Sequence, residues 1–116
     1  MTVQECYESI GADFEGVLGR MGSEAMVKRF ALKFPDDPCY GNLVKAVEEQ
    51  NAEEAFRAAH TLKGICLNLG LDRLYEVSAC LTEKLRGRAF DGYEEAYEKV
   101  QQEYHNTVDA IRTMEE

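Results

Sequence analysis

Residues 58–70 read AAHTLKGICLNLG, and this stretch decides how the rest of the chain can fold. Apolar residues recur in and around it at the spacing of an amphipathic helix: Ala55, Ala58, Ala59, Leu62, Ile65, Cys66 and Leu69. At about 100° per residue, His60 and Gly64 point roughly 160° away from the centre of that apolar stripe. The stretch therefore predicts a helix that buries one face and holds a histidine out into water.

Capping residues mark both ends of this helix. Asn51, followed three residues later by Glu54, has the spacing of a capping box. Gly70 is well placed for the left-handed conformation that ends a helix. We therefore expect one helix over residues 52–69 that turns at once into the next.

Short helices are predicted before this element. Thr2, Asp13 and Ser23 are suitable N-caps for three of them within residues 2–34, and Pro35 is expected to stop the third. Asp37, followed by Pro38, is expected to cap the next helix.

Longer helices are predicted from there to the end of the chain. Apolar stripes indicate four bundle helices, the last opened by Asp91 with Glu94, over about 38–50, 52–69, 71–88 and 92–114. Their short connections require neighbouring helices to be antiparallel. We therefore expect an all-α protein, an up-down antiparallel four-helix bundle whose short N-terminal helices cover one end.

The composition narrows the possible functions. With 116 residues the chain can bury one sizeable core and is expected to form a single domain over residues 1–116. Its net charge of −9 argues against nucleic acid or an anionic membrane as partner. We see no apolar run of about 18 residues and no basic, apolar leader, so we expect a cytoplasmic protein without a membrane span.

The charge is unevenly distributed along the chain. From Arg57 to Arg88 there are six basic and three acidic residues, a net +3, which leaves −12 on the remainder of a chain whose total is −9. The region around His60 is therefore predicted to be locally positive and to favour a phosphate or an acidic partner.

The cysteines are predicted to be structural. Cys6, Cys39, Cys66 and Cys80 form no CxxC pair, and the last two fall on apolar helix stripes. We expect small buried side chains with free thiols. A disulfide pair and a Cys/His metal site are the alternatives.

Chemistry is most plausible at His60. Gly64 lies one helical turn beyond it on the same face, and a glycine inside a helix leaves room for another molecule to approach the imidazole. Lys63 and Arg57 offer positive charge beside the ring, which would attract and partly neutralise a phosphoryl group. The other histidine, His105, has no such companions and is expected to be an ordinary surface or boundary residue.

Two apolar residues extend this site. Phe56 and Leu67 lie roughly 120° and 140° from the centre of the apolar stripe, on the side of the helix that faces water. Apolar side chains in such positions suggest a docking surface, with scattered surface hydrophobes as the alternative. We therefore predict a docking face of Phe56, Arg57 and Leu67 around His60 and Gly64.

The motif that begins at His60 resembles the signature of histidine phosphotransfer (HPt) domains, the relay modules of bacterial multistep two-component signalling. That signature has a histidine, a lysine at +3, a glycine at +4, a small residue at +5 and a glycine at +10. His60, Lys63, Gly64 and Gly70 match it. Ile65 departs from it, and because Ile65 falls on the stripe side we expect a change in packing and no loss of chemistry.

The resemblance extends from about Ser23 to the C-terminus through the order and length of the helices. It implies that the imidazole of His60 takes a phosphoryl group from the aspartate of a response-regulator receiver domain and passes it to another receiver. We expect a free-standing, monomeric carrier without turnover of its own, and because the sequence has no Gly-rich phosphate loop we do not expect it to use ATP. The receiver would supply Mg²⁺, so no metal or cofactor is expected here, and a hybrid sensor histidine kinase is a further candidate partner.

Two other functions are compatible with the sequence. The bundle could be an adaptor or decoy that binds a receiver or kinase without accepting phosphate, although the intact set of His60, Lys63 and Gly64 argues against this. A small metal-binding or redox protein is the other alternative. His60 and Cys66 are six residues apart and point to opposite sides of the helix, which is poor geometry for shared metal ligation.

Overall fold

Helices make up all the regular structure of the computed structural model, which describes residues 1–114. Those residues form seven α-helices and one 3₁₀ turn and no β-strand: α1 (Val3–Ser9), α2 (Phe14–Met21), α3 (Glu24–Lys33), η1 (Phe34–Asp36), α4 (Cys39–Glu48), α5 (Ala52–Leu69), α6 (Asp72–Leu85) and α7 (Glu94–Thr113). The all-α class predicted from the sequence is therefore confirmed.

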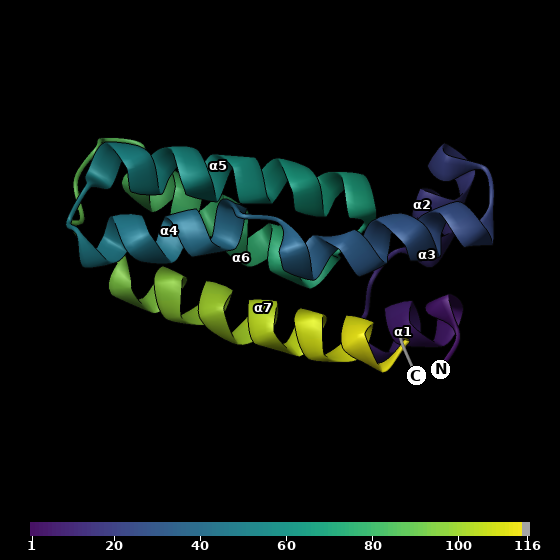
Figure 1. Ribbon diagram of the computed structural model, residues 1–116. Coiled ribbons are helices and arrows are strands. Elements are labelled where there is room, and N and C mark those ends of the chain that lie inside the picture. Colours follow the sequence, from purple (N-terminus) through teal and green to yellow (C-terminus); the bar gives the residue numbers. More distant parts are fainter. Residues whose placement is uncertain (115–116) are drawn as a thin grey trace.

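The last four helices form an up-down antiparallel bundle (Figure 1). Each packs against its neighbour in the chain, α4 on α5, α5 on α6 and α6 on α7. The ring of four is closed where Tyr40 of α4 stacks on Tyr104 of α7, with ring centroids 3.6 Å apart and an interplanar angle of 4°. This confirms the predicted architecture.

A continuous apolar core lies between these helices. Each contributes at least one apolar side chain with no exposed surface, among them Leu43, Leu62, Leu81 and Val100. Burying a side chain of this size contributes about 1.5–3 kcal/mol relative to leaving it in water. The core therefore fixes the rotation of α5 about its own axis, and with it the side of the bundle on which His60 emerges.

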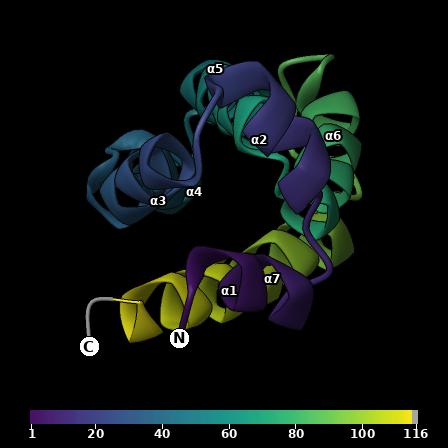
Figure 2. The ribbon, with the colours of Figure 1, turned by 90° about the vertical axis from the view of Figure 1, so that its right-hand side faces the viewer.

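The three N-terminal helices lie at one end of the bundle (Figure 2). α1 packs beside the C-terminal part of α7, and α3 contacts both α5 and α7. Tyr7 of α1 has no exposed surface and meets Phe14 of α2 edge to face at 5.8 Å. As predicted, these helices cover one end, and that end holds the C-terminus of α5.

The predicted N-caps are only partly correct. The side chains of Thr2, Asp13 and Ser23 accept backbone N–H bonds at the starts of α1, α2 and α3 as expected. The prediction for Asp37 is wrong by one residue, because α4 begins at Cys39 with Pro38 as its N-cap. Asp37 still accepts a hydrogen bond from the Cys39 N–H at 2.9 Å.

The start of the last helix was also predicted wrongly. Asp91 does not cap it, because Gly92 adopts a left-handed backbone (φ +67°) and redirects the chain. The helix therefore begins at Glu94, with Tyr93 as an N-cap that makes no side-chain hydrogen bond.

The helix ends agree only in part with the predicted boundaries. α3 stops before Pro35 as expected, at Lys33, and a 3₁₀ turn, which accommodates a proline in its first positions, follows over Phe34–Asp36. α4 ends at Glu48, because Gln50 has a φ of +57°. α6 ends at Leu85 and not at residue 88, because the chain turns there and Arg88 has a φ of +60°.

Candidate functional site

The helix that carries the candidate site, α5, is fixed at both ends. The side-chain oxygen of Asn51 accepts the Glu54 N–H at 3.1 Å. At the other end Gly70 has a φ of +67°, and a Cβ there would collide with Val17 and lie 2.8 Å from the carbonyl oxygen of Asp13. Gly70 is therefore required both by the backbone conformation and by the close approach of the N-terminal layer.

The N-terminal layer also binds the free carbonyl groups at the end of α5. The hydroxyl of Tyr7 donates to the Leu69 carbonyl at 2.8 Å, a bond that is buried. The Arg20 guanidinium donates to the carbonyls of Leu67 and Asn68 at 3.1 and 3.0 Å. Tyr7 and Arg20 thus bind carbonyls of the last turn, of which that of Leu67 also accepts the Gly70 N–H at 3.3 Å, so α1 and α2 hold the end of α5 in place.

His60 lies in the middle of α5 with its side chain exposed to solvent. Its neighbours Ala59 and Leu62 have no exposed surface, so the helix turns the imidazole away from the core. The ring lies nearly parallel to that of Phe56, one turn earlier, with centroids 6.1 Å apart and an interplanar angle of 9°. Phe56 is half-buried and packs against the core, which makes it a support for the imidazole as well as a surface residue.

Free space adjoins the imidazole. A Cβ built on Gly64 would meet no heavy atom within 4 Å outside its own helix. Leu67, one turn further on, is 60% exposed, while Lys63 is half-buried. The structure thus places His60, Gly64 and Leu67 on one open face, with room for another molecule above the histidine.

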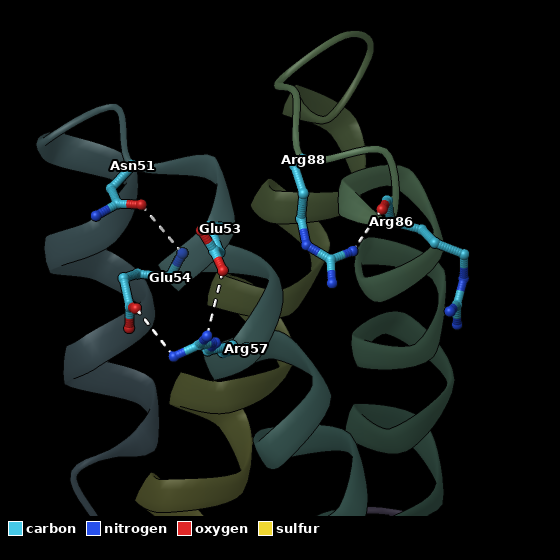
Figure 3. A network of polar contacts seen from close by, with 6 residues as sticks. All are labelled: Asn51, Glu53, Glu54, Arg57, Arg86 and Arg88. Carbon is cyan, nitrogen blue, oxygen red and sulfur yellow. Dashed lines mark hydrogen bonds and ion pairs between the residues drawn. The ribbon is translucent and has the colours of Figure 1, made fainter.

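Arg57 does not join this cluster in the way the sequence suggested. Its guanidinium pairs with the carboxylates of Glu53 at 3.2 Å and Glu54 at 3.4 Å, both on α5 (Figure 3). It lines a groove between α4 and α5 together with Asn42 and Lys45. Arg57 is therefore compensated within its own helix and faces α4, whereas Phe56 and Lys63 lie on the α6 side by helical geometry.

Two arginines from the segment after α6 reach the site, and the sequence analysis did not assign them to it. The Cζ atom of Arg88 lies 3.8 Å from the centroid of the Phe56 ring, and that of Arg86 lies 5.6 Å from it. Nη1 of Arg88 donates to the Arg86 carbonyl oxygen, at 2.6 Å, as Figure 3 shows. The turn after Leu85 is what brings these two residues over α5.

On the α6 side of the site, Glu83 is the carboxylate that interacts with the neighbouring cations. Its carboxylate accepts two hydrogen bonds from Arg86, at 2.9 and 2.7 Å. Arg86 first, and the positive charge of Lys63 to a smaller extent, hold the pKa of Glu83 below its usual value. Lys63 therefore acts on the space between α5 and α6, next to the imidazole.

Three of the four cysteines are buried free thiols, as predicted: Cys6, Cys39 and Cys66. Burial, with a smaller contribution from the Asp37 carboxylate, raises the pKa of Cys39 to about 12. Such thiols stay protonated and unreactive near neutral pH. The prediction for Cys80 is wrong, because this residue is exposed. It precedes the buried Leu81 by one residue and so points about 100° away from the apolar stripe of α6.

Residues 1–114 contain no cluster of three or more His, Cys, Asp or Glu side chains in an arrangement that could hold a metal ion. His60 is exposed and Cys66 has no exposed surface, so the two do not converge. Over the same residues, no helix is both long and apolar enough to cross a membrane.

The imidazole of His60 is thus exposed in the middle of one helix of a four-helix bundle. A four-helix bundle that exposes a histidine in this way belongs to the helical proteins that another molecule can approach from outside. Residues 37–113, more than half of the chain, match the family described as Hpt domain, and the chain belongs to that family. Comparison with curated proteins gave no match, and neither did comparison with solved structures.

Membership of this family gives the general function. Hpt domains are phosphotransfer carriers, not catalysts, and act in phosphorelays with receiver domains or kinases as partners. The match begins at residue 37, so helices α1 to α3 lie outside it. These helices nevertheless hold the end of α5. In the sequence, only their N-cap residues and Gly70 indicated that such helices pack there.

Proposed function

We propose that His60 is the phosphoacceptor of this carrier and that it relays a phosphoryl group between the aspartates of two receiver domains. The observation that carries the proposal is the exposed imidazole beside the open space at Gly64. His105, the other histidine, is also exposed, but its ring meets the edges of Tyr40 and Tyr104, at centroid distances of 6.0 and 5.8 Å. It has no glycine or lysine companion at helical spacing.

The proposed reaction is a displacement at phosphorus. A neutral imidazole nitrogen of His60 attacks the phosphorus of the aspartyl phosphate, the bond between phosphorus and the carboxylate oxygen breaks, and the aspartate leaves as a carboxylate. The reverse sequence on a second receiver releases His60. Lys63 contributes positive charge beside the group in transit, and the receiver brings the acidic pocket and its Mg²⁺.

The docking contact is proposed to centre on α5. A receiver must bring its aspartate within bonding distance of the imidazole, which requires backbone or a loop to pass close to the helix. Gly64 leaves that space free, and Leu67 offers an exposed apolar side chain one turn away. The exposed apolar surface would be covered in the complex and would contribute to its affinity.

Phosphotransfer profiling tests this proposal. The protein is incubated with each phosphorylated receiver domain of the same genome, and acid-labile, base-stable label on the protein is measured. We expect label on the wild-type protein and on the control variant His105→Gln, and none on His60→Gln. Label that survives in His60→Gln would refute the assignment. Tight binding to several phosphorylated receivers with no label on the wild-type protein would indicate an adaptor instead.

A further inference from the structure

The cations beside His60 differ in whether a carboxylate already compensates them. Arg57 pairs with Glu53 and Glu54, and Arg86 pairs with Glu83. Within residues 1–114, neither Lys63 nor Arg88 forms an ion pair. The positive charge that is available to a new anion at the imidazole therefore belongs to these two residues.

Arg88 is held in an unusual backbone conformation. Its φ of +60° lies in the left-handed region, where side chains other than glycine are uncommon. Gly87 immediately precedes it, and Gly87 does not have a positive φ. The turn thus places its strained position on an arginine although a glycine is adjacent, and such strain often marks a residue whose side chain is needed for function.

The side chain of Arg88 is directed by two contacts. The guanidinium lies over the Phe56 ring at 3.8 Å, and one of its nitrogens donates to the Arg86 carbonyl. Phe56 in turn stacks beside the imidazole at 6.1 Å, so the guanidinium carbon lies no more than about 10 Å from the His60 ring centre, a distance close to the Debye length of about 8–10 Å at 0.15–0.1 M salt. A guanidinium has five N–H donors, and most of those of Arg88 remain free to bind an anion.

We propose that Arg88 is the second phosphoryl-binding cation of this site and acts together with Lys63. This rests on the proposed role of His60. When the imidazole carries a phosphoryl group, the guanidinium of Arg88 moves from the face of Phe56 and donates hydrogen bonds to the non-bridging oxygens. It forms no covalent bond. Arginine suits this task because its planar fork matches two phosphoryl oxygens.

The test uses phosphoramidate, a small donor that needs no partner protein. The imidazole nitrogen attacks its phosphorus, the bond from phosphorus to nitrogen breaks, and ammonia leaves. The rate of labelling and the lifetime of the label are measured for the wild-type protein, Arg88→Gln and Arg57→Gln. Both variants lose one positive charge from the same end of the bundle, but Arg57 is already compensated. In Arg88→Gln we expect the rate of labelling and the lifetime of the label each to be three to ten times lower than in the wild type, roughly the effect of one exposed charge-assisted hydrogen bond. Arg57→Gln should match the wild type in both.

A further variant separates binding from folding. Arg88→Gly removes the guanidinium but suits the positive φ, so its unfolding midpoint should match or exceed that of the wild type. Its label should nevertheless be as short-lived as that of Arg88→Gln, and the ³¹P resonance of the phosphohistidine should shift in both variants but not in Arg57→Gln. Equal labelling and lifetime in Arg88→Gln, Arg88→Gly and the wild type would overturn the role of Arg88 alone. Absence of label on the wild-type protein, from phosphoramidate and from every receiver, would overturn the role of His60 and this inference with it.

Discussion

Substitution of Gly64 should change stability and phosphotransfer in opposite directions. Gly64 lies well inside α5, and a Cβ built there meets no heavy atom within 4 Å outside the helix. Gly64→Ala should therefore add only the better helix propensity of alanine, about 1 kcal/mol of unfolding free energy. For a domain of this size that corresponds to a melting temperature about 4 °C higher.

The same methyl group should obstruct the partner. If a receiver packs closely against the backbone at Gly64, each added group must be accommodated by a shift in a tight contact, which costs about 1–3 kcal/mol. Transfer from a phosphorylated receiver should then be about 5- to 150-fold slower for Gly64→Ala, since about 1.4 kcal/mol corresponds to a factor of ten. A bulky residue such as glutamine should block transfer about as completely as the loss of His60.

Urea denaturation and single-turnover transfer kinetics measure the two effects. Gly19→Ala is the matched control, because Gly19 lies within α2 and a Cβ there also meets nothing within 4 Å. It should gain stability without slowing transfer. Transfer from the receiver at the wild-type rate in a stabilised Gly64→Ala protein would refute the reasoning that this glycine clears space for the partner. If Gly64→Ala lost stability, the conclusion that the space around Gly64 is open would be wrong.

Two further predictions concern the anchoring of the bundle. Tyr7→Phe should lower the free energy of unfolding, measured by urea denaturation, by about 1–3 kcal/mol, because it leaves the Leu69 carbonyl buried without its donor. Tyr75→Phe is the control and should change this free energy little, because the Tyr75 hydroxyl makes no hydrogen bond within residues 1–114. Because the pKa of Cys39 rises from 9.0 to about 12 on folding, its thiol ionises first in the unfolded chain, and stability should fall by about 1.4 kcal/mol per pH unit from pH 9 towards 12. This part of the slope should be absent in Cys39→Ala, and an unchanged slope would contradict the assignment.

Most of the fold could be predicted because its signals are local. The spacing of apolar residues fixes the buried face of α5, and Asn51 and Gly70 mark its ends through hydrogen bonds to adjacent residues. Predictions failed where a turn redirected the chain. Asp91 had the spacing of a cap, but the left-handed Gly92 moved the start of α7, and a glycine in sequence does not reveal whether it will adopt a positive φ.

The candidate site was predictable along one helix but not across helices. His60, Lys63 and Gly64 follow from positions three and four residues apart, which a helix places together. The approach of Arg88 to Phe56 depends on where α6 ends and how the chain turns afterwards, which no local spacing specifies. Tyr7 and Leu69, 62 residues apart, form their hydrogen bond for the same kind of reason.

Charge counting along the chain predicts a positive region around His60, but it does not show which residues carry the available charge. The net +3 between Arg57 and Arg88 includes two arginines that are compensated in the structure, one of them by Glu53 and Glu54, which lie just outside the counted stretch. An anion is attracted by the charge that remains after this local pairing. Exposed ion pairs of this kind add little to stability, but their opposite charges still cancel each other's field at a distance. The positive field at the imidazole therefore depends on Lys63 and Arg88. A variant that disrupts the pairs of Arg57 should change phosphotransfer far less than one that removes either of these two charges.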